Sequence, residues 1–193
     1  MEIAPGVDAK QWTKLDLSKG DSTAWKKAIE ILRKRIEERY LEPVDRLIES
    51  EESRPPQRRR YGFVVLAIDC LLIETLQAFF EGKIDTKRDS GPMFVKFLTS
   101  RELFKTDFSK DLAGRFYAQI RCGILHQGET RKARLSSVGK LIRSNGDEMV
   151  LNRTEFHSRL KREFEAYLNG LSEGTDAKLR SNLRKKMDHI CTN

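Results

Sequence analysis

Cysteine and histidine are scarce in this chain of 193 residues, and neither is arranged as a set of metal ligands. The three cysteines are widely separated: Cys70, Cys122 and Cys191. Their odd number and the lack of a Cys-x-x-Cys pair argue against a disulfide framework and favour a reducing compartment. The three histidines are equally scattered: His126, His157 and His189. We therefore expect no metal site, and nothing else in the sequence calls for a cofactor.

The motifs of several enzyme classes are also missing. No glycine-rich phosphate loop follows a predicted strand, which argues against P-loop and dinucleotide-binding proteins. Neither Gly-x-Ser-x-Gly nor His-Glu-x-x-His occurs in the chain. The sequence therefore does not indicate the hydrolases that depend on these two motifs.

Long apolar runs free of charge are absent. The longest candidate, residues 63–80, is interrupted by Asp69 and Glu74. Residues 1–10 lack the basic start and the apolar block of a secretory signal. We therefore expect a soluble, cytoplasmic protein with no membrane partner.

Positive charge is in excess, and it is spread unevenly. The net charge is +8, and residues 131–193 hold 14 Lys and Arg against 8 Asp and Glu, so that +6 of the excess lies there. An excess of this kind attracts RNA or DNA in a salt-dependent way. The alternative is a charged surface that only keeps the protein soluble.

Hydrophobic periodicity predicts an all-α protein, a helical bundle of four to five main helices. Helical patterns occur at residues 22–40, 61–81, 92–99, 109–127, 152–168 and 179–190. Asp21 or Ser22 is expected to cap the first helix, and Pro43 to end it or to kink its continuation. The second is apolar nearly all round and stops at Gly82, so it should be the central, most buried element.

One small β-hairpin is predicted at about residues 138–151, around Asn145-Gly146. Asn152 then begins the next helix, with Glu155 completing a capping box. The expected division is a partly ordered N-terminal arm at 1–20, a helical domain at 21–170 and a basic C-terminal helix at 171–193. The stretch Glu49–Arg60 reads as a charged linker without packing potential.

Arg121 and His126 lie five positions apart within an apolar helical run, flanked by core-type isoleucine and leucine residues. A guanidinium and an imidazole together suit phosphate chemistry. A second pair with this spacing, Arg184 and His189, lies in a polar tail and lacks that setting. The simpler alternative is that His126 only contacts exposed carbonyls at a helix end and that Arg121 is a surface cation.

In these residues the chain resembles HEPN-domain proteins (higher eukaryotes and prokaryotes nucleotide-binding), with a likeness covering residues 22–170. Arg121 and His126 match the family's Arg-x-x-x-x-His pattern, and Glu74 lies on the apolar helix before them. The resemblance implies a metal-independent ribonuclease of toxin, phage-defence or RNA-processing type, with catalytic pairs from two protomers. Cys122 departs from the family's frequent Asn, Asp or His, and a thiol supports an orienting hydrogen bond only weakly.

Helix geometry also favours a dimer. Five helical residues turn by about 500°, so Arg121 and His126 point about 140° apart and lie about 7.5 Å apart along the axis. A second copy related by two-fold symmetry would bring both pairs around one groove, and Gly123 is expected to let the helix deform. His126 would move protons and Arg121 would hold the phosphate while the RNA 2′-hydroxyl attacks it, with Glu74 orienting Arg121.

The expected partners are RNA, a second copy of the chain and a neutralising or regulatory protein. Five basic residues are candidate nucleic-acid contacts: Arg58, Arg59, Arg60, Arg131 and Lys132. One alternative function is a catalytically inactive module that binds RNA, a nucleotide or a protein. A weaker one is DNA binding by the C-terminal basic helix.

Overall fold

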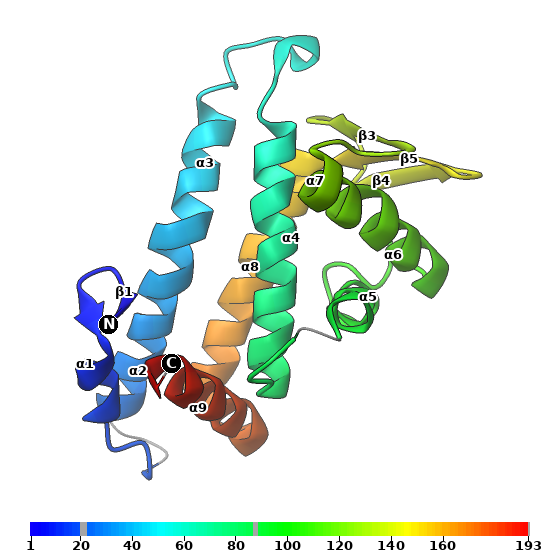
Figure 1. Cartoon of the computed structure of the whole chain (residues 1–193). Coiled ribbons are helices and arrows are strands. Elements are labelled where there is room, and N and C mark those ends of the chain that lie inside the picture. The colour runs from blue at the N-terminus through cyan, green and yellow to red at the C-terminus, as the bar shows by residue number, and fades with distance from the viewer. Residues whose placement is uncertain (20–22, 87–88, 193) are drawn as a thin grey trace.

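The long apolar helix α4 (Gly62–Glu81) runs through the centre of the molecule, as its composition predicts (Figure 1). The computed structural model describes residues 1–19, 23–86 and 89–192. The rod of α2 (Thr23–Ile36), η1 (Glu37–Leu41) and α3 (Glu42–Glu49) lies on one side of α4. On the other side lies a second rod, made of α6 (Lys110–Phe116), η3 (Tyr117–Arg121) and α7 (Cys122–Gln127).

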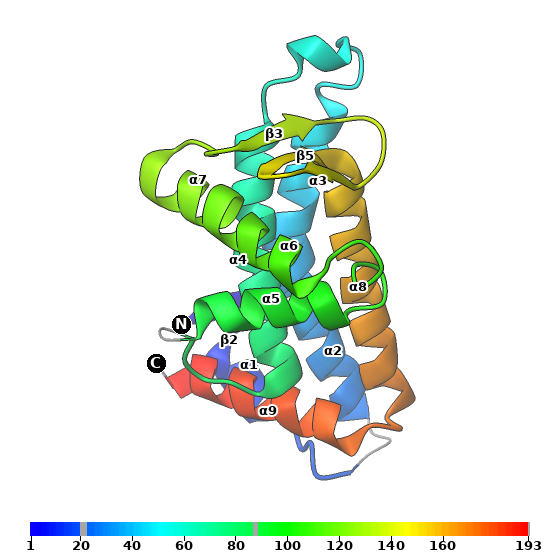
Figure 2. The same cartoon turned by 90° about the vertical axis from the view of Figure 1, so that its right-hand side faces the viewer.

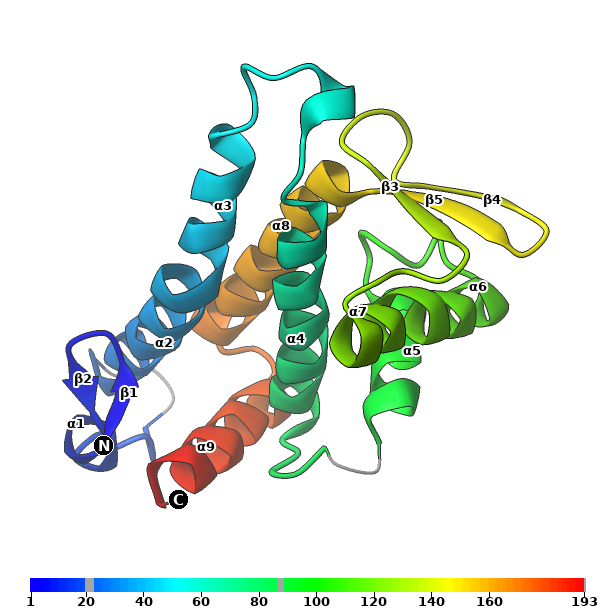
Figure 3. The same ribbon diagram turned by 45° about the horizontal axis from the view of Figure 1, so that its top comes forward.

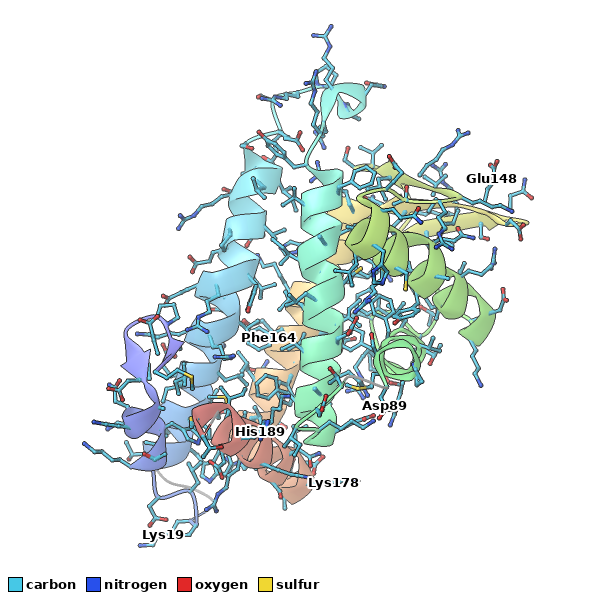
Figure 4. The ribbon with its side chains drawn as sticks, in the orientation of Figure 1. Lys19, Asp89, Glu148, Phe164, Lys178 and His189 are labelled. Carbon is cyan, nitrogen blue, oxygen red and sulfur yellow. The ribbon has the colours of Figure 1, made fainter. Side chains whose placement is uncertain are left out.

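The remaining helices close the bundle. The helix α8 (Arg153–Glu173) packs along α4, while α5 (Ser90–Ser100) and α9 (Ala177–Thr192) run across the long helices (Figure 2). Phe164 of α8 lies inside, between α2 and α4 (Figure 4), and its side chain is fully buried. The mainly helical character of the predicted bundle is therefore confirmed, but the described residues form more helices than the four to five expected. The apolar side chains of the long helices α2, α4 and α8 meet in one common core.

The first long helix does not end at Pro43. It continues past this residue through a π-helical turn, η1, which agrees with the kinked continuation that the sequence offered as an alternative. Pro43 has no N–H and cannot bond to the carbonyl four residues back. Just before it, Glu42 donates its backbone N–H to the carbonyl of Glu37, five residues back. The predicted caps of this helix, Asp21 and Ser22, lie outside the described residues.

The sheet content exceeds the single hairpin that the sequence predicts. The strands β4 (Ile142–Asn145) and β5 (Glu148–Asn152) form that hairpin, but β3 (Ala133–Ser136) pairs with β5 in parallel (Figure 3). A second, two-stranded sheet joins β1 (Glu2–Ala4) to β2 (Val7–Asp8). The protein is thus mainly helical rather than all-α. The additional strands have two to four residues each, too few to show a clear alternation.

The N-terminal segment is folded onto the bundle. It forms β1, β2 and the short helix α1 (Ala9–Thr13), and buries Ile3 and Trp12 in the same core as Leu183 and Met187 of α9. The indole Nε1 of Trp12 donates to Asp188 Oδ1 at 2.7 Å, which joins α1 to α9. The expected arm at 1–20 and the C-terminal helix therefore share the main core.

The caps at α8 are formed only in part as predicted. Asn152 accepts hydrogen bonds from the backbone N–H groups of Thr154 and Glu155, both at 3.2 Å. The return contact of a capping box is replaced, because Asn152 N–H donates to the carbonyl of Leu141 and Glu155 pairs with Arg159.

The helix α4 has the length and hydropathy of a membrane-spanning segment, and 56% of its most apolar window is buried inside the molecule. Burial against other helices is typical of the core helix of a soluble protein. Among the described residues it is the single helix with these properties.

Candidate active site

The rod α6–η3–α7 presents the Arg-x-x-x-x-His motif beside α4. Ser109 caps its start, accepting a hydrogen bond from Leu112 N–H at 3.1 Å. Phe116 and Ile120 are fully buried and hold one side of the rod against the core. A π-helical turn, η3, ends at Arg121, and the Cys122 N–H donates to the carbonyl of Tyr117. The extra residue in this turn rotates the segment that follows relative to α6.

Arg121 forms an ion pair with Glu74 of α4, the contact that the sequence suggested. The distance from Arg121 Nε to Glu74 Oε1 is 2.6 Å, and the two side chains are only 18% and 14% exposed. Burial disfavours the charged guanidinium, but the hydrogen bond and negative charge of Glu74 outweigh it and raise the pKa of Arg121. The guanidinium carbon also lies 5.4 Å from the ring centre of Tyr117.

This ion pair uses one edge of the guanidinium. Arg121 donates to Glu74 through Nε, and its two terminal nitrogens have no acceptor among the residues that the structure describes. A planar guanidinium binds phosphate best through two parallel N–H groups. Glu74 therefore fixes the orientation of Arg121, while the two terminal nitrogens of Arg121 have no partner among the described residues.

His126 lies in the last turn of α7 and is exposed. The helix ends at Gly128, whose positive φ of 64° forms the left-handed cap expected from the sequence. No protein group described in the structure hydrogen-bonds to the imidazole of His126. Because the five residues after Arg121 are α-helical, the two side chains point in different directions, as the helical geometry predicts. One protomer therefore does not bring them together.

Gly123 has a different role from the one expected. The helix α7 is regular through Gly123, so the glycine does not deform it. Instead, a Cβ atom at this position would collide with the carbonyl oxygen of Glu129. Gly123 thus allows the chain that leaves α7 to fold back closely over it. Cys122 beside it is half-buried, and its thiol has no hydrogen bond to a described residue.

Arg121 and Glu74 line a groove that we call the α4 groove. It has a volume of about 680 Å³, and its walls come from α2, η1, α4, η3, α7 and α9. Two of its lining residues are exposed apolar side chains, Leu71 of α4 and Leu125 of α7, at 47% and 61%. Val64, seven residues before Leu71 on the same side of α4, is 48% exposed. We call these three residues the exposed apolar face. His126 follows Leu125 directly but does not line the groove.

The candidate nucleic-acid contacts lie in two places. Arg58 and Arg60 are exposed in the tip between α3 and α4, beside the turn η2 (Pro56–Arg58; Figure 3). Arg59 donates to the carbonyls of Arg54 and Glu52, which ties it to the tip itself. Among the described residues, no hydrogen bond or ion pair joins this cluster to the second one, Arg131 and Lys132.

The second pair of candidate contacts, Arg131 and Lys132, lies between α7 and β3. Arg131 is exposed, and only its backbone N–H is bound, to the carbonyl of Gln119. The Lys132 ammonium is 2.8 Å from the carboxylate of Asp147 in an exposed ion pair. Arg131 is thus the freer of the two cations.

The stretch Glu49–Arg60 is not a linker without packing, because Glu51 is fully buried. Its carboxylate accepts the backbone N–H groups of Arg60 and Tyr61 and pairs with Arg153 at 2.6 Å. Burial raises the carboxyl pKa, but these three partners outweigh it and hold the pKa of Glu51 below its ordinary value. Sequence reasoning missed this anchor because its closest partners are backbone groups or, like Arg153, lie far away in the sequence.

Asp69, which interrupts the apolar run of α4, is a buried carboxylate that has a polar partner. It is fully buried, and its Oδ1 lies 2.7 Å from Nδ1 of His157, which is also buried. Burial is the main cause that raises the pKa of Asp69, against the stabilising contact with His157. This pair serves the core of the bundle and stands apart from Arg121 and His126. Within residues 1–19, 23–86 and 89–192, no cluster of three or more His, Cys, Asp and Glu side chains could hold a metal ion.

Comparison with protein-family models, curated protein sequences and solved structures gives no significant match. The fold and the site therefore define a class only in structural terms. This is a mainly helical protein with an oriented arginine in a groove and an exposed histidine one helical turn beyond it.

Proposed function

We propose that the protein is a metal-independent endoribonuclease of HEPN type that acts as a dimer. The observation that carries this proposal is the oriented guanidinium of Arg121. Glu74 holds it by Nε at 2.6 Å, and both terminal nitrogens remain available for a phosphate at the edge of a groove. An arginine needed only for stability would be expected to use more of its donors within the protein.

Each residue has a defined role in this reaction. The RNA 2′-hydroxyl attacks the adjacent phosphorus, a cyclic phosphate forms and the 5′-oxygen leaves. Arg121 stabilises the negative charge that develops on the phosphoryl oxygens, and Glu74 positions Arg121. His126 takes the proton from the 2′-hydroxyl or gives one to the leaving 5′-oxygen, and water carries out the other of these two transfers. Cys122 has no required step.

The site is completed by the second copy. Arg121 and His126 diverge within one chain, so a phosphate held by one protomer's Arg121 needs the other protomer's His126. Leu71 and Leu125 of the exposed apolar face line the groove together with Arg121, and Leu125 directly precedes His126, so this face would be buried in such a contact. A two-fold axis beside α7 produces two equivalent arginine–histidine pairs.

The test is cleavage of RNA by the purified protein in EDTA. We expect His126→Ala and Arg121→Ala each to lower the cleavage rate by at least about 100-fold, the range of one general acid–base or charge-stabilising group. Gln127→Ala, which changes the exposed neighbour of His126, is the matched control and should keep the wild-type rate. The circular dichroism spectrum should be the same in all variants.

A cyclic phosphate at the 3′ end of the product would identify the 2′-hydroxyl as the nucleophile. Equal cleavage by wild type and His126→Ala would reject the proposal. A toxin or phage-defence role with a neutralising protein partner follows from the HEPN resemblance and depends on this result.

The second candidate function is a catalytically inactive module that binds RNA. Arg58 and Arg60 favour it, because both are exposed at a protruding tip. Under this alternative, RNA binding without cleavage would weaken on Arg58→Gln and Arg60→Gln. His126→Ala would leave this RNA binding unchanged. The salt dependence of binding should become shallower with each lost phosphate contact.

A further inference from the structure

The far end of the α4 groove holds two cations that the proposed reaction does not use. Arg35 of α2 donates one terminal nitrogen to the carbonyl of Ile3. Lys186 of α9 donates its ammonium to the carbonyl of Ile84 at 3.1 Å. Both line the groove and are half-buried. Among the described residues, neither has a carboxylate within ion-pair distance, whereas most other half-buried arginines of the chain have one.

The two cations are held in an unfavourable environment. Burial lowers the pKa of Arg35, and the nearby charge of Arg39 lowers it further. Burial also lowers the pKa of Lys186, and the positive charge of Arg35 adds to that effect. Asp85 near Lys186 offsets this only in part. A pair of like charges removed from water is costly unless an anion joins them.

Between this cationic end and the Arg121–Glu74 pair, the lining of the groove is mainly apolar. Ile68, Phe79 and Ile124 line it, and Ile190 lies one helical turn beyond Lys186 on the same helix. The hydroxyl of Tyr40, on the π-helical turn η1, is a further polar group close to Arg35. A volume of about 680 Å³ is in the range of small-molecule sites. The groove thus has a cationic end and a long apolar wall.

We propose that the α4 groove binds a small amphipathic anion. Its carboxylate or phosphate head lies between Arg35 and Lys186, and its apolar body lies along α4 between α9 and α7. The head-group residues belong to α2 and α9, which carry neither the catalytic pair nor the exposed apolar face. This ligand site goes beyond the endoribonuclease proposal and does not depend on it.

The test uses four ten-carbon probes below the concentrations at which they form micelles: decanoate, decyl phosphate, decanol and decyltrimethylammonium. Binding to the full chain is measured by calorimetry and by the shift in melting temperature. We expect both anions to bind and to raise the melting temperature. Decanol should bind at least about tenfold more weakly, the loss expected for one charge-assisted hydrogen bond, and the cation should not bind. Inorganic phosphate alone should bind more weakly than decyl phosphate because it lacks the apolar body.

Substitutions at Lys186 and Arg35 test whether these two residues bind the anionic head group. Lys186→Met should weaken decanoate binding by about tenfold or more, while Lys185→Met, which changes the exposed neighbour on the same helix, should leave it unchanged. Arg35→Gln is the second variant, and it should weaken anion binding in the same way. His126→Ala should bind decanoate as wild type does, which separates this site from the proposed catalysis. Equal affinity for decanol and decanoate, binding unaffected by both Lys186→Met and Arg35→Gln, or no binding of either anion would overturn the proposal.

Discussion

At the scale of single residues, two buried ion pairs join parts of the chain that lie far apart in the sequence. Glu51 meets Arg153, and Asp69 meets His157, each across about a hundred residues of sequence. A buried ion pair contributes little net stability, but removing one partner leaves an uncompensated charge. These pairs therefore fix how α3, α4 and α8 align more than they add to stability.

Glu51→Gln tests how strongly the stability of the protein depends on the buried pair of Glu51 and Arg153. The change removes the negative charge opposite Arg153, so we expect the free energy of unfolding at pH 7 to fall by about 3 kcal/mol, the usual effect of breaking a buried pair. Glu52→Gln, at the exposed neighbouring position, should change it by less than about 0.5 kcal/mol. Urea unfolding monitored by circular dichroism measures both values.

The same variant carries a pH prediction. The pKa of Glu51 in the folded protein lies below its ordinary value of 4.5. The Glu51 carboxylate therefore contributes its full stabilisation at pH values above 4.5. This contribution is lost as the pH falls through the lowered pKa that Glu51 has in the folded protein. The difference between wild type and Glu51→Gln should shrink in acid. A constant difference from pH 7 down to pH 3 would contradict the assignment.

At the scale of elements, both π-helical turns border the α4 groove. Tyr40 comes from η1 and Arg121 from η3, and each faces the groove from its own rod. A π turn inserts one residue into a helix and re-aims the side chains that follow. In the first rod the turn accommodates Pro43, whereas in the second it lies directly before the candidate active site.

The close return of the chain after α7 can be tested at Gly123. A Cβ there would collide with the carbonyl oxygen of Glu129, so Gly123→Ala should displace the segment that joins α7 to β3 and lower stability by about 1–3 kcal/mol. Gly114→Ala in α6 is the matched control. Nothing lies within 4 Å of its added Cβ, and alanine should stabilise that helix by up to about 1 kcal/mol. Thermal unfolding of both variants measures the contrast, and a stabilised Gly123→Ala would contradict the close approach.

At the scale of the whole molecule, local sequence patterns predicted the helices and the hairpin. The contacts between distant segments could not be predicted in this way. The run from Gly62 to Glu81 and the caps at Ser109 and Asn152 could be read from short stretches, as could the hairpin at Gly146. The parallel pairing of β3 with β5, the burial of Ile3 and the ion pair of Glu51 with Arg153 could not. Each depends on which segments meet in space, and a single sequence carries no local signal for that.

The candidate site, too, could be predicted from the sequence only in part. Its motif and the position of Glu74 on the apolar helix before it were visible in the sequence, and the structure adds the 2.6 Å contact to Arg121. The cationic end of the groove was not visible. Arg35 and Lys186 are some 150 positions apart, and each reads as an ordinary surface cation among many.

The dimer is the prediction that concerns the whole molecule. Leu71→Glu and Leu125→Glu place charges on the exposed apolar face, so we expect each variant to be a folded monomer by light scattering and to lose RNA cleavage. Val138→Glu changes an exposed apolar residue in the loop between β3 and β4 and should leave both properties unchanged. A wild-type protein that is monomeric at the concentrations where it cleaves RNA would contradict the composite site.

Mixing two inactive variants tests the composite site directly. In a mixture of Arg121→Ala and His126→Ala, each mixed dimer keeps one intact pair, Arg121 from one protomer and His126 from the other. Random exchange makes half of the dimers mixed, and each has one of two working sites, so cleavage should return to about a quarter of the wild-type rate. Adding Leu71→Glu to both variants should abolish this recovery because it prevents pairing. Failure to recover activity in a mixture that demonstrably exchanges protomers would show that the arginine and the histidine do not act across two chains.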